Sequence, residues 1–116
     1  MGQFGLLSGD FNPLHINDDF ARRLGFVKKV CYGNILGFLV SHLVGMKLGC
    51  EEVMLISQKI DYKSPMYSGN IISLKGEITE KSQSVRIITL ALSFSNELGT
   101  VVATGKCQVR FFENAI

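Results

Sequence analysis

An acid and a base, Asp10 and His15, lie five residues apart in the stretch LLSGDFNPLHINDDFA. A carboxylate and a neutral imidazole aimed at one water form a pair that can add water to a polarised double bond, or remove it. Pro13 fixes its own φ angle and pushes Asn12 towards extended geometry, while Gly9 permits a turn that other residues resist. We therefore expect a loop of few conformations that aims both side chains at one point. The residues alone also allow a structural loop, in which Asp10 accepts bonds from backbone amides and His15 is merely packed.

Length, charge and hydropathy limit the partners of this chemistry. The 116 residues suffice for one domain, 1–116, with a substantial core. Twelve Lys and Arg against ten Asp and Glu leave a net charge of +2 and no basic patch, so nucleic acid is not an expected partner. The apolar stretches fall short of the roughly 20 residues that a bilayer span needs, and no secretory signal opens the chain. We expect no membrane partner and a cytoplasmic protein.

The metal-ligating residue types are scattered rather than grouped. Cys31, Cys50 and Cys107 are an odd number, lie far apart and form no C-x-x-C pair, which signals neither a disulfide framework nor a zinc site. His42 has no second His, Asp or Glu four residues away that would support a metal ligand. The expected chemistry therefore uses no metal and no redox cofactor.

Two helices are predicted before the chain changes its period. Asn17 can cap the first helix, and Gly25 ends it. Its charges are spaced i,i+4 in two pairs, Asp18 with Arg22 and Asp19 with Arg23. The second helix runs from about Asn34, its candidate cap, to Leu48, with Gly49 as the stop. Apolar residues surround nearly its whole circumference, which predicts a helix buried on all sides.

From Val53 onward the apolar residues alternate with a period of two, which predicts four half-buried strands. The breaks KSQS and NELG are short enough for hairpins, so the last three strands should form an antiparallel meander. The alternating apolar positions are Met54, Ile56, Ile60, Tyr62, Ile72, Leu74, Ile78, Ile88, Leu90, Leu92, Phe94, Val101, Ala103, Cys107, Val109 and Phe111.

One apolar helix followed by an alternating antiparallel sheet has a natural packing solution. The sheet can curve around the helix and bury it, which is the α+β hot-dog fold, a curved antiparallel sheet wrapped around a central apolar helix. A single short sheet leaves an edge exposed, and this favours pairing of two copies. We therefore expect a homodimer, with higher oligomers still open.

The stretch FGLLSGDFNPLHINDDFA closely resembles the hydratase signature of the MaoC-like family, the (R)-specific enoyl-CoA hydratases and related acyl dehydratases. That signature has an aromatic residue followed by S-G-D-x-N-P-[LIV]-H and later a small residue. The matching positions are Phe4, Ser8, Gly9, Asp10, Asn12, Pro13, Leu14, His15 and Ala21. VCYGNILGFLVSHLVG resembles the family's entry into the hot-dog helix, and YKSPMYSGNIISLKGEI its strand, proline and turn, so the likeness covers nearly the whole chain.

The resemblance implies a hydratase or dehydratase that acts on an acyl thioester of coenzyme A or of acyl carrier protein. Asp10 and His15 would hold one water for syn addition across a trans-2-enoyl thioester, giving the (R)-3-hydroxyacyl product, or for the reverse reaction. The backbone amide of Gly33 would be the oxyanion donor. The remaining implied residues support the loop, namely Ser8, Gly9, Asn12 and Pro13, or contact the substrate, namely Tyr32, Asn34 and Phe38.

The chain also departs from the family pattern. Relatives usually carry a strand and a turn ahead of the motif, so the N-terminal strand is expected to be short or missing here. Tyr32 stands where many relatives have His, Phe38 where some have Ser, and Asn70 replaces an acidic turn residue. The bulk of Phe38 predicts a preference for short acyl chains. Two alternatives therefore stay open, a catalytically silent acyl-thioester-binding subunit of a heteromer and a hot-dog thioesterase.

Overall fold

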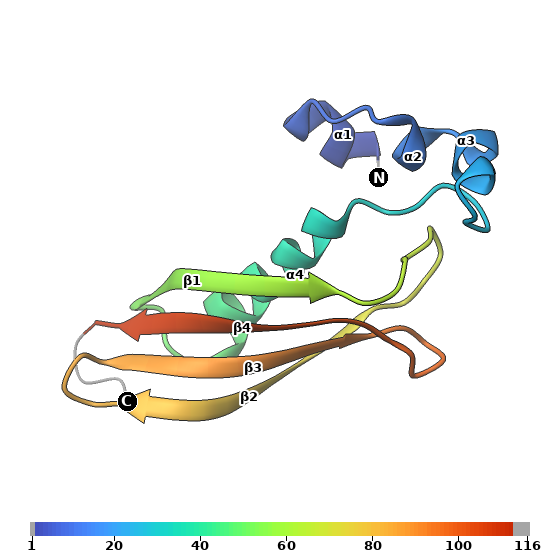
Figure 1. The fold of residues 1–116 in the computed structure, drawn as a ribbon. Helices are drawn as coiled ribbons and strands as arrows, with labels where there is room; N and C mark the ends of the chain where they lie inside the picture. The colour runs from blue at the N-terminus through green and yellow to red at the C-terminus, as the bar shows by residue number, and fades with distance from the viewer. Residues whose placement is uncertain (1, 113–116) are drawn as a thin grey trace.

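The computed structural model describes residues 2–112, which form a group of short helices, one longer helical segment and a sheet (Figure 1). The short helices are α1 (Gly2–Ser8), α2 (Pro13–Ile16) and α3 (Asp18–Arg23). The longer segment joins a 3-10 turn η1 (Gly33–Ile35), α4 (Leu36–His42) and a π-helical turn η2 (Leu43–Lys47). The strands are β1 (Val53–Tyr62), β2 (Ser73–Ser82), β3 (Ile87–Ser95) and β4 (Val101–Phe111).

The four strands form one antiparallel sheet in the order β1-β4-β3-β2. β2, β3 and β4 follow one another as the meander that the hairpin breaks predicted. The first strand, β1, pairs with the last strand, β4, on the side of β4 opposite β3. This leaves β1 and β2 as the two edges of the sheet. α4 lies against one face of this sheet, in the α+β arrangement expected from the sequence (Figure 1).

The core lies between the helical segment and the two central strands. The buried core residues are Leu36, Val40, Val44, Met66, Ile88, Leu90, Leu92, Phe94, Val102, Ala103, Cys107, Val109 and Phe111. The prediction that the helix is buried on all sides was wrong, because the side chains of Phe38 and Met46 are 57% and 73% exposed in the single chain. One sheet covers only one side of a helix, so the opposite apolar side is left uncovered.

The ends of the helical segment differ in part from the expectation. It begins one residue earlier, at Gly33, and no side chain caps the turn that follows Tyr32. The assignment of Asn34 as the cap was therefore wrong, because Asn34 already lies inside the first turn. At the other end Gly49 has a φ of +77°, the left-handed conformation that stops a helix, as predicted.

A β-bulge changes the inward face of β1. Val53 and Leu55 pack against the core, whereas Met54 and Ile56, expected to face inward, are exposed. The register of β1 on β4 shifts just after Leu55, and Ile60 again packs against the core. The extra residue reverses the alternation for the first half of the strand.

Similar register shifts explain two further positions whose exposure differs from the prediction. β2 shifts against β3 just after Ile78, whose side chain is exposed instead of buried. β3 shifts against β4 at its end, and there Val102 is buried while Val101 is exposed. The other alternating positions of β3 and β4 face the core as predicted.

The short helices at the start of the chain, α1 to α3, precede the residues that form the core. Residues 2–8, which include the first motif positions Phe4 and Ser8, form α1. The side-chain oxygen of Asn17 accepts the N–H of Phe20, as expected of a helix cap. Arg22 pairs with Asp19 three residues away at 3.4 Å, rather than with Asp18. Asp18 instead accepts the backbone N–H of Lys29 at 2.9 Å, which lowers the pKa of this carboxyl.

The described part of the chain has neither a membrane-spanning helix nor a metal-binding cluster. Within residues 2–112, no helix combines the length and the apolar character needed to cross a membrane. Over the same range, no three His, Cys, Asp or Glu residues gather into a group able to hold a metal ion. The three cysteines carry free thiols.

Candidate active site

The loop that carries Asp10 is built from side chains bonded to nearby backbone amides. Ser8 Oγ accepts the N–H of Asp10 at 3.1 Å, and Asp10 Oδ1 accepts the N–H of Asn12 at 3.0 Å. Asn12 Oδ1 in turn accepts the N–H of Leu14 at 3.0 Å, which caps α2. Gly9 adopts a φ of +75°, a conformation that residues with a Cβ resist. The turns fix the backbone and leave Asp10 Oδ2 for another partner.

His15 lies on α2, a single helical turn that starts at Pro13, so the expected irregular loop is shorter than the sequence suggested. Its Nδ1 is 2.7 Å from the carbonyl oxygen of Val30, which can only accept a hydrogen bond. Nδ1 therefore carries the proton of the neutral ring, and Nε2 presents its lone pair. Nε2 lies 4.0 Å from Asp10 Oδ2, so the structure brings the two predicted side chains together.

Tyr32 supports both members of this pair. Its hydroxyl donates to the backbone carbonyl of Asp10 at 2.6 Å, and its ring stacks on His15 with the centroids 4.3 Å apart. Phe4 of α1 packs on the other rings, 4.6 Å from Tyr32 and 5.8 Å from Phe38 between centroids. Tyr32 is almost fully buried, so its main contacts are with the loop residues that it positions.

A small cavity of about 240 Å³ opens in front of the pair. Its lining includes Gly33 and Asn34, two of the positions implied by the resemblance, together with Tyr62 of β1. The full lining is Phe4, Asp10, His15, Tyr32, Gly33, Asn34 and Tyr62. Phe38, expected to contact substrate, is not among the described residues that line it, because its ring points towards Phe4 at the exposed side of α4.

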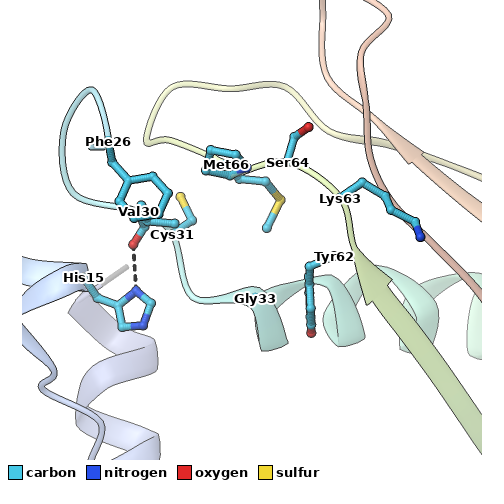
Figure 2. A pocket seen from close by; sticks show the side chains of 10 residues that line it. His15, Phe26, Val30, Cys31, Gly33, Tyr62, Lys63, Ser64 and Met66 are labelled. Carbon is cyan, nitrogen blue, oxygen red and sulfur yellow. Dashed lines mark hydrogen bonds between the residues drawn. The ribbon is translucent and has the colours of Figure 1, made fainter. Parts of the chain in front are cut away.

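A second cavity of about 410 Å³ adjoins the first (Figure 2). His15, Gly33 and Tyr62 line both cavities. The remaining lining comes from the segments before η1 and after β1, namely Phe26, Val30, Cys31, Lys63, Ser64, Pro65 and Met66. Burial raises the pKa of the Cys31 thiol and of the Tyr62 hydroxyl, so both groups stay protonated at neutral pH.

Tyr62 packs directly on the start of the helical segment. A Cβ placed on Gly33 would lie 2.8 Å from Tyr62 Cε1, so only glycine allows this contact. The alternating pattern predicted Tyr62 to be a core position of β1 and indicated no role at the site. The partner of His15, the carbonyl of Val30, was also missed, because it is 15 residues away and a backbone group has no sequence signature.

The turn around Asn70 lies apart from this site, and the Asn70 side chain holds the turn together. Asn70 Oδ1 accepts the N–H of Tyr67 at 2.9 Å, and its amide donates to Glu97 at 3.0 Å. Gly69 has a φ of +95°. Backbone bonds, including the N–H of Ile71 at 3.0 Å, hold the pKa of the Glu97 carboxyl below its usual value.

Comparisons with known proteins identify the family of this chain. The model of the MaoC like domain matches residues 1–111. The (R)-specific enoyl-CoA hydratase of Aeromonas caviae is 30% identical over 107 residues, which cover 92% of this chain and 80% of that protein. The 3-hydroxybutyryl-CoA dehydratase of Methylorubrum extorquens is 30% identical over 92 residues, 79% of this chain and 59% of that protein.

A solved structure extends the likeness to the fold. The (R)-hydratase from A. caviae involved in PHA biosynthesis superposes with a TM-score of 0.87 at 29% identity, covering 96% of this chain and 84% of the other. The hot-dog fold expected from the sequence is thereby confirmed. The chain belongs to the MaoC-like domain family.

Proposed function

We propose that this protein is a hydratase or dehydratase that interconverts trans-2-enoyl and (R)-3-hydroxyacyl thioesters of coenzyme A or acyl carrier protein. The observation that carries the proposal is the approach of His15 Nε2 to Asp10 Oδ2 at 4.0 Å, with the other ring nitrogen held by Val30. The two relatives, an (R)-specific enoyl-CoA hydratase and a 3-hydroxybutyryl-CoA dehydratase, support the same reaction class.

The two side chains can hold one water between them. Both facing atoms are acceptors, because Asp10 is a carboxylate and Nε2 of His15 carries no proton in the neutral ring. A water about 2.8 Å from each atom spans the 4.0 Å separation and donates one hydrogen to each. Its lone pairs then point away from the protein pair, towards a substrate in the cavity.

Hydration follows from that orientation. The water oxygen forms a bond to C3 of the enoyl group while one of its protons passes to the Asp10–His15 pair. The π electrons of the double bond move towards the thioester carbonyl, and C2 then receives a proton from the same pair. Both additions occur on one face, which is syn addition, and dehydration reverses each step.

The developing negative charge needs a donor at the thioester oxygen. We assign this role to the backbone N–H of Gly33, at the N-terminus of the helical segment and on the wall of the small cavity. The positive end of a helix dipole and a preset N–H both stabilise an oxyanion. Asn34, on the same wall, is proposed to contact the substrate, and Ser8 and Asn12 hold the loop.

Incubation with crotonyl-CoA tests the proposal. Loss of the enoyl absorbance with formation of (R)-3-hydroxybutyryl-CoA is the expected result. Release of free coenzyme A instead would identify a thioesterase, and binding without turnover would identify a silent acyl-binding subunit. Either of these two results would overturn the hydratase assignment.

The working unit is proposed to be a homodimer. β1 is an unpaired sheet edge, and the apolar side chains of Phe38, Met46, Met54 and Ile56 are exposed in the single chain. An open edge and uncovered apolar residues are features that association of two copies removes.

A further inference from the structure

The hydroxyl of Tyr62 is a polar group at the small cavity that the proposed reaction does not use. Tyr62 lines this cavity together with Asp10, His15 and Gly33. Figure 2 shows its ring extending from the end of β1 alongside the start of the helical segment. In the described part of the chain, residues 2–112, no hydrogen bond involves this hydroxyl. It keeps its proton at neutral pH, because burial raises its pKa, and so it can donate.

The Tyr62 hydroxyl lies close to the backbone N–H of Gly33, the proposed oxyanion donor. A Cβ placed on Gly33 would lie 3.2 Å from the hydroxyl oxygen. The Cβ and the backbone nitrogen of one residue are about 2.5 Å apart, so the Gly33 nitrogen lies within about 5.7 Å of that oxygen. Two donors that each bond one oxygen at about 2.9 Å can be at most about 5.8 Å apart. The two groups are therefore close enough to share one acceptor.

The N–H of Gly33 also lacks an acceptor within residues 2–112. It belongs to the first turn of the helical segment, where backbone N–H groups have no acceptor inside the helix. No side chain caps this turn, and no backbone carbonyl of the described residues accepts this N–H. Two donors of different origin thus lie at one cavity without an acceptor. Such a pair suits an oxygen atom that gains negative charge.

We propose that the Tyr62 hydroxyl is a second hydrogen-bond donor to the thioester oxygen of the substrate, beside the Gly33 N–H. This inference rests on the proposed function, because it takes an acyl thioester as the ligand. The hydroxyl donates a hydrogen bond and keeps its proton. Negative charge on the thioester oxygen grows as the reaction proceeds, so the bond is stronger in the transition state than in the bound substrate. Tyr62 therefore lowers the barrier more than it tightens binding.

The variant Tyr62→Phe tests the hydroxyl alone, because it keeps the ring that packs on Gly33. We expect kcat for crotonyl-CoA to fall about tenfold to a hundredfold, the range for one hydrogen bond to a charged group. KM should change by less than about threefold. Tyr67→Phe is the matched control, because its hydroxyl accepts the N–H of Val27 at 3.3 Å and lies off the small cavity. It should keep kcat near that of the wild type, and thermal melting checks that both variants fold.

Infrared spectroscopy tests the contact without turnover. The ligand is butyryl-CoA labelled with carbon-13 at the thioester carbonyl, a saturated thioester that cannot be hydrated. Each hydrogen bond to a carbonyl oxygen weakens the C=O bond and lowers its stretching wavenumber. The band of the bound ligand should therefore lie at lower wavenumber with the wild type and with Tyr67→Phe than with Tyr62→Phe.

Four results would overturn the inference. These are an unchanged band in Tyr62→Phe, an equal change of the band in Tyr67→Phe, wild-type kcat in Tyr62→Phe, and a wild type that binds no butyryl-CoA. The inference and the proposed function can fail separately. A band that depends on the Tyr62 hydroxyl, in a protein that does not hydrate crotonyl-CoA, would keep the donor and remove the proposed reaction. Hydration with no effect of Tyr62→Phe would keep the reaction and remove the donor.

Discussion

Replacing Gly33 by Ala tests the packing on which both cavities depend. The new Cβ would lie 2.8 Å from Cε1, 2.9 Å from Cζ and 3.2 Å from the hydroxyl of Tyr62. Carbon atoms in contact prefer about 3.5–4.0 Å, so the ring must move by roughly 1 Å. It can do so, because Tyr62 ends the edge strand β1 and is already 52% exposed. We therefore expect Gly33→Ala to fold with a displaced Tyr62 ring.

The magnitude follows from the part of the ring that is still covered. A tyrosine side chain buries about 200 Å² when fully covered, and about half of this remains to be lost, which costs at most about 2.5 kcal/mol. Alanine in a helical turn returns about 0.5–1 kcal/mol relative to glycine. The net loss of stability should be about 1–2 kcal/mol, whereas kcat/KM should fall about tenfold to a hundredfold because the reaction geometry shifts.

A double-mutant cycle with Tyr62→Ala identifies the cause of this loss. If the clash with Tyr62 is responsible, Gly33→Ala should cost much less in the Tyr62→Ala background, with a coupling of at least about 1 kcal/mol in both stability and kcat/KM. Thermal melting and crotonyl-CoA hydration measure the two quantities. Wild-type kcat/KM in Gly33→Ala, or additive effects of the two changes, would refute the reasoning.

Three further predictions concern the proposed catalytic pair, the sheet and the assembly. Asp10→Asn and His15→Ala should each lower kcat about a hundredfold to ten-thousandfold, and the double variant should lower kcat little more than the worse single variant. Near wild-type turnover in both folded single variants would mean that the loop is structural. Gly105→Ala should lower the free energy of unfolding by about 3 kcal/mol, because its Cβ would meet the backbone carbonyl of Lys59. Gly45→Ala, with open space around its Cβ, should leave the free energy of unfolding almost unchanged. Equal midpoints of the two variants in chemical denaturation would contradict the contact at Gly105. Light scattering at micromolar concentration should give twice the chain mass of 12.8 kDa, and a monomer mass would exclude the homodimer.

Much of the fold could be read from local patterns. The hairpin breaks and the alternation in β3 predicted the meander, because a two-residue period and a short polar turn are properties of adjacent residues. The inward face of β1 could not be predicted in the same way. Its bulge follows Leu55 and depends on the pairing with β4, so Met54 was assigned to the wrong face by a strict period of two.

The candidate site likewise contains residues that a local motif predicts and a residue that only the tertiary structure reveals. Asp10 and His15 were found because a turn of fixed geometry lies in one continuous stretch, where Gly9 and Pro13 restrict the backbone. Tyr62 could not be assigned to the site from the sequence. An inward-facing position in a strand follows the same alternation whether its side chain packs in the core or against the start of a helix. The ring reaches the cavity because the end of β1 lies beside Gly33 in the folded chain.

The hydrogen bond from His15 to Val30 has a consequence for the whole reaction cycle. Its donor, the Nδ1–H group, is present in both the neutral imidazole and the imidazolium, so gain or loss of a proton at Nε2 leaves the bond intact. The ring needs no flip and no change of tautomer between the steps of turnover. In the proposed mechanism, one fixed orientation of the His15 ring therefore serves both hydration and dehydration.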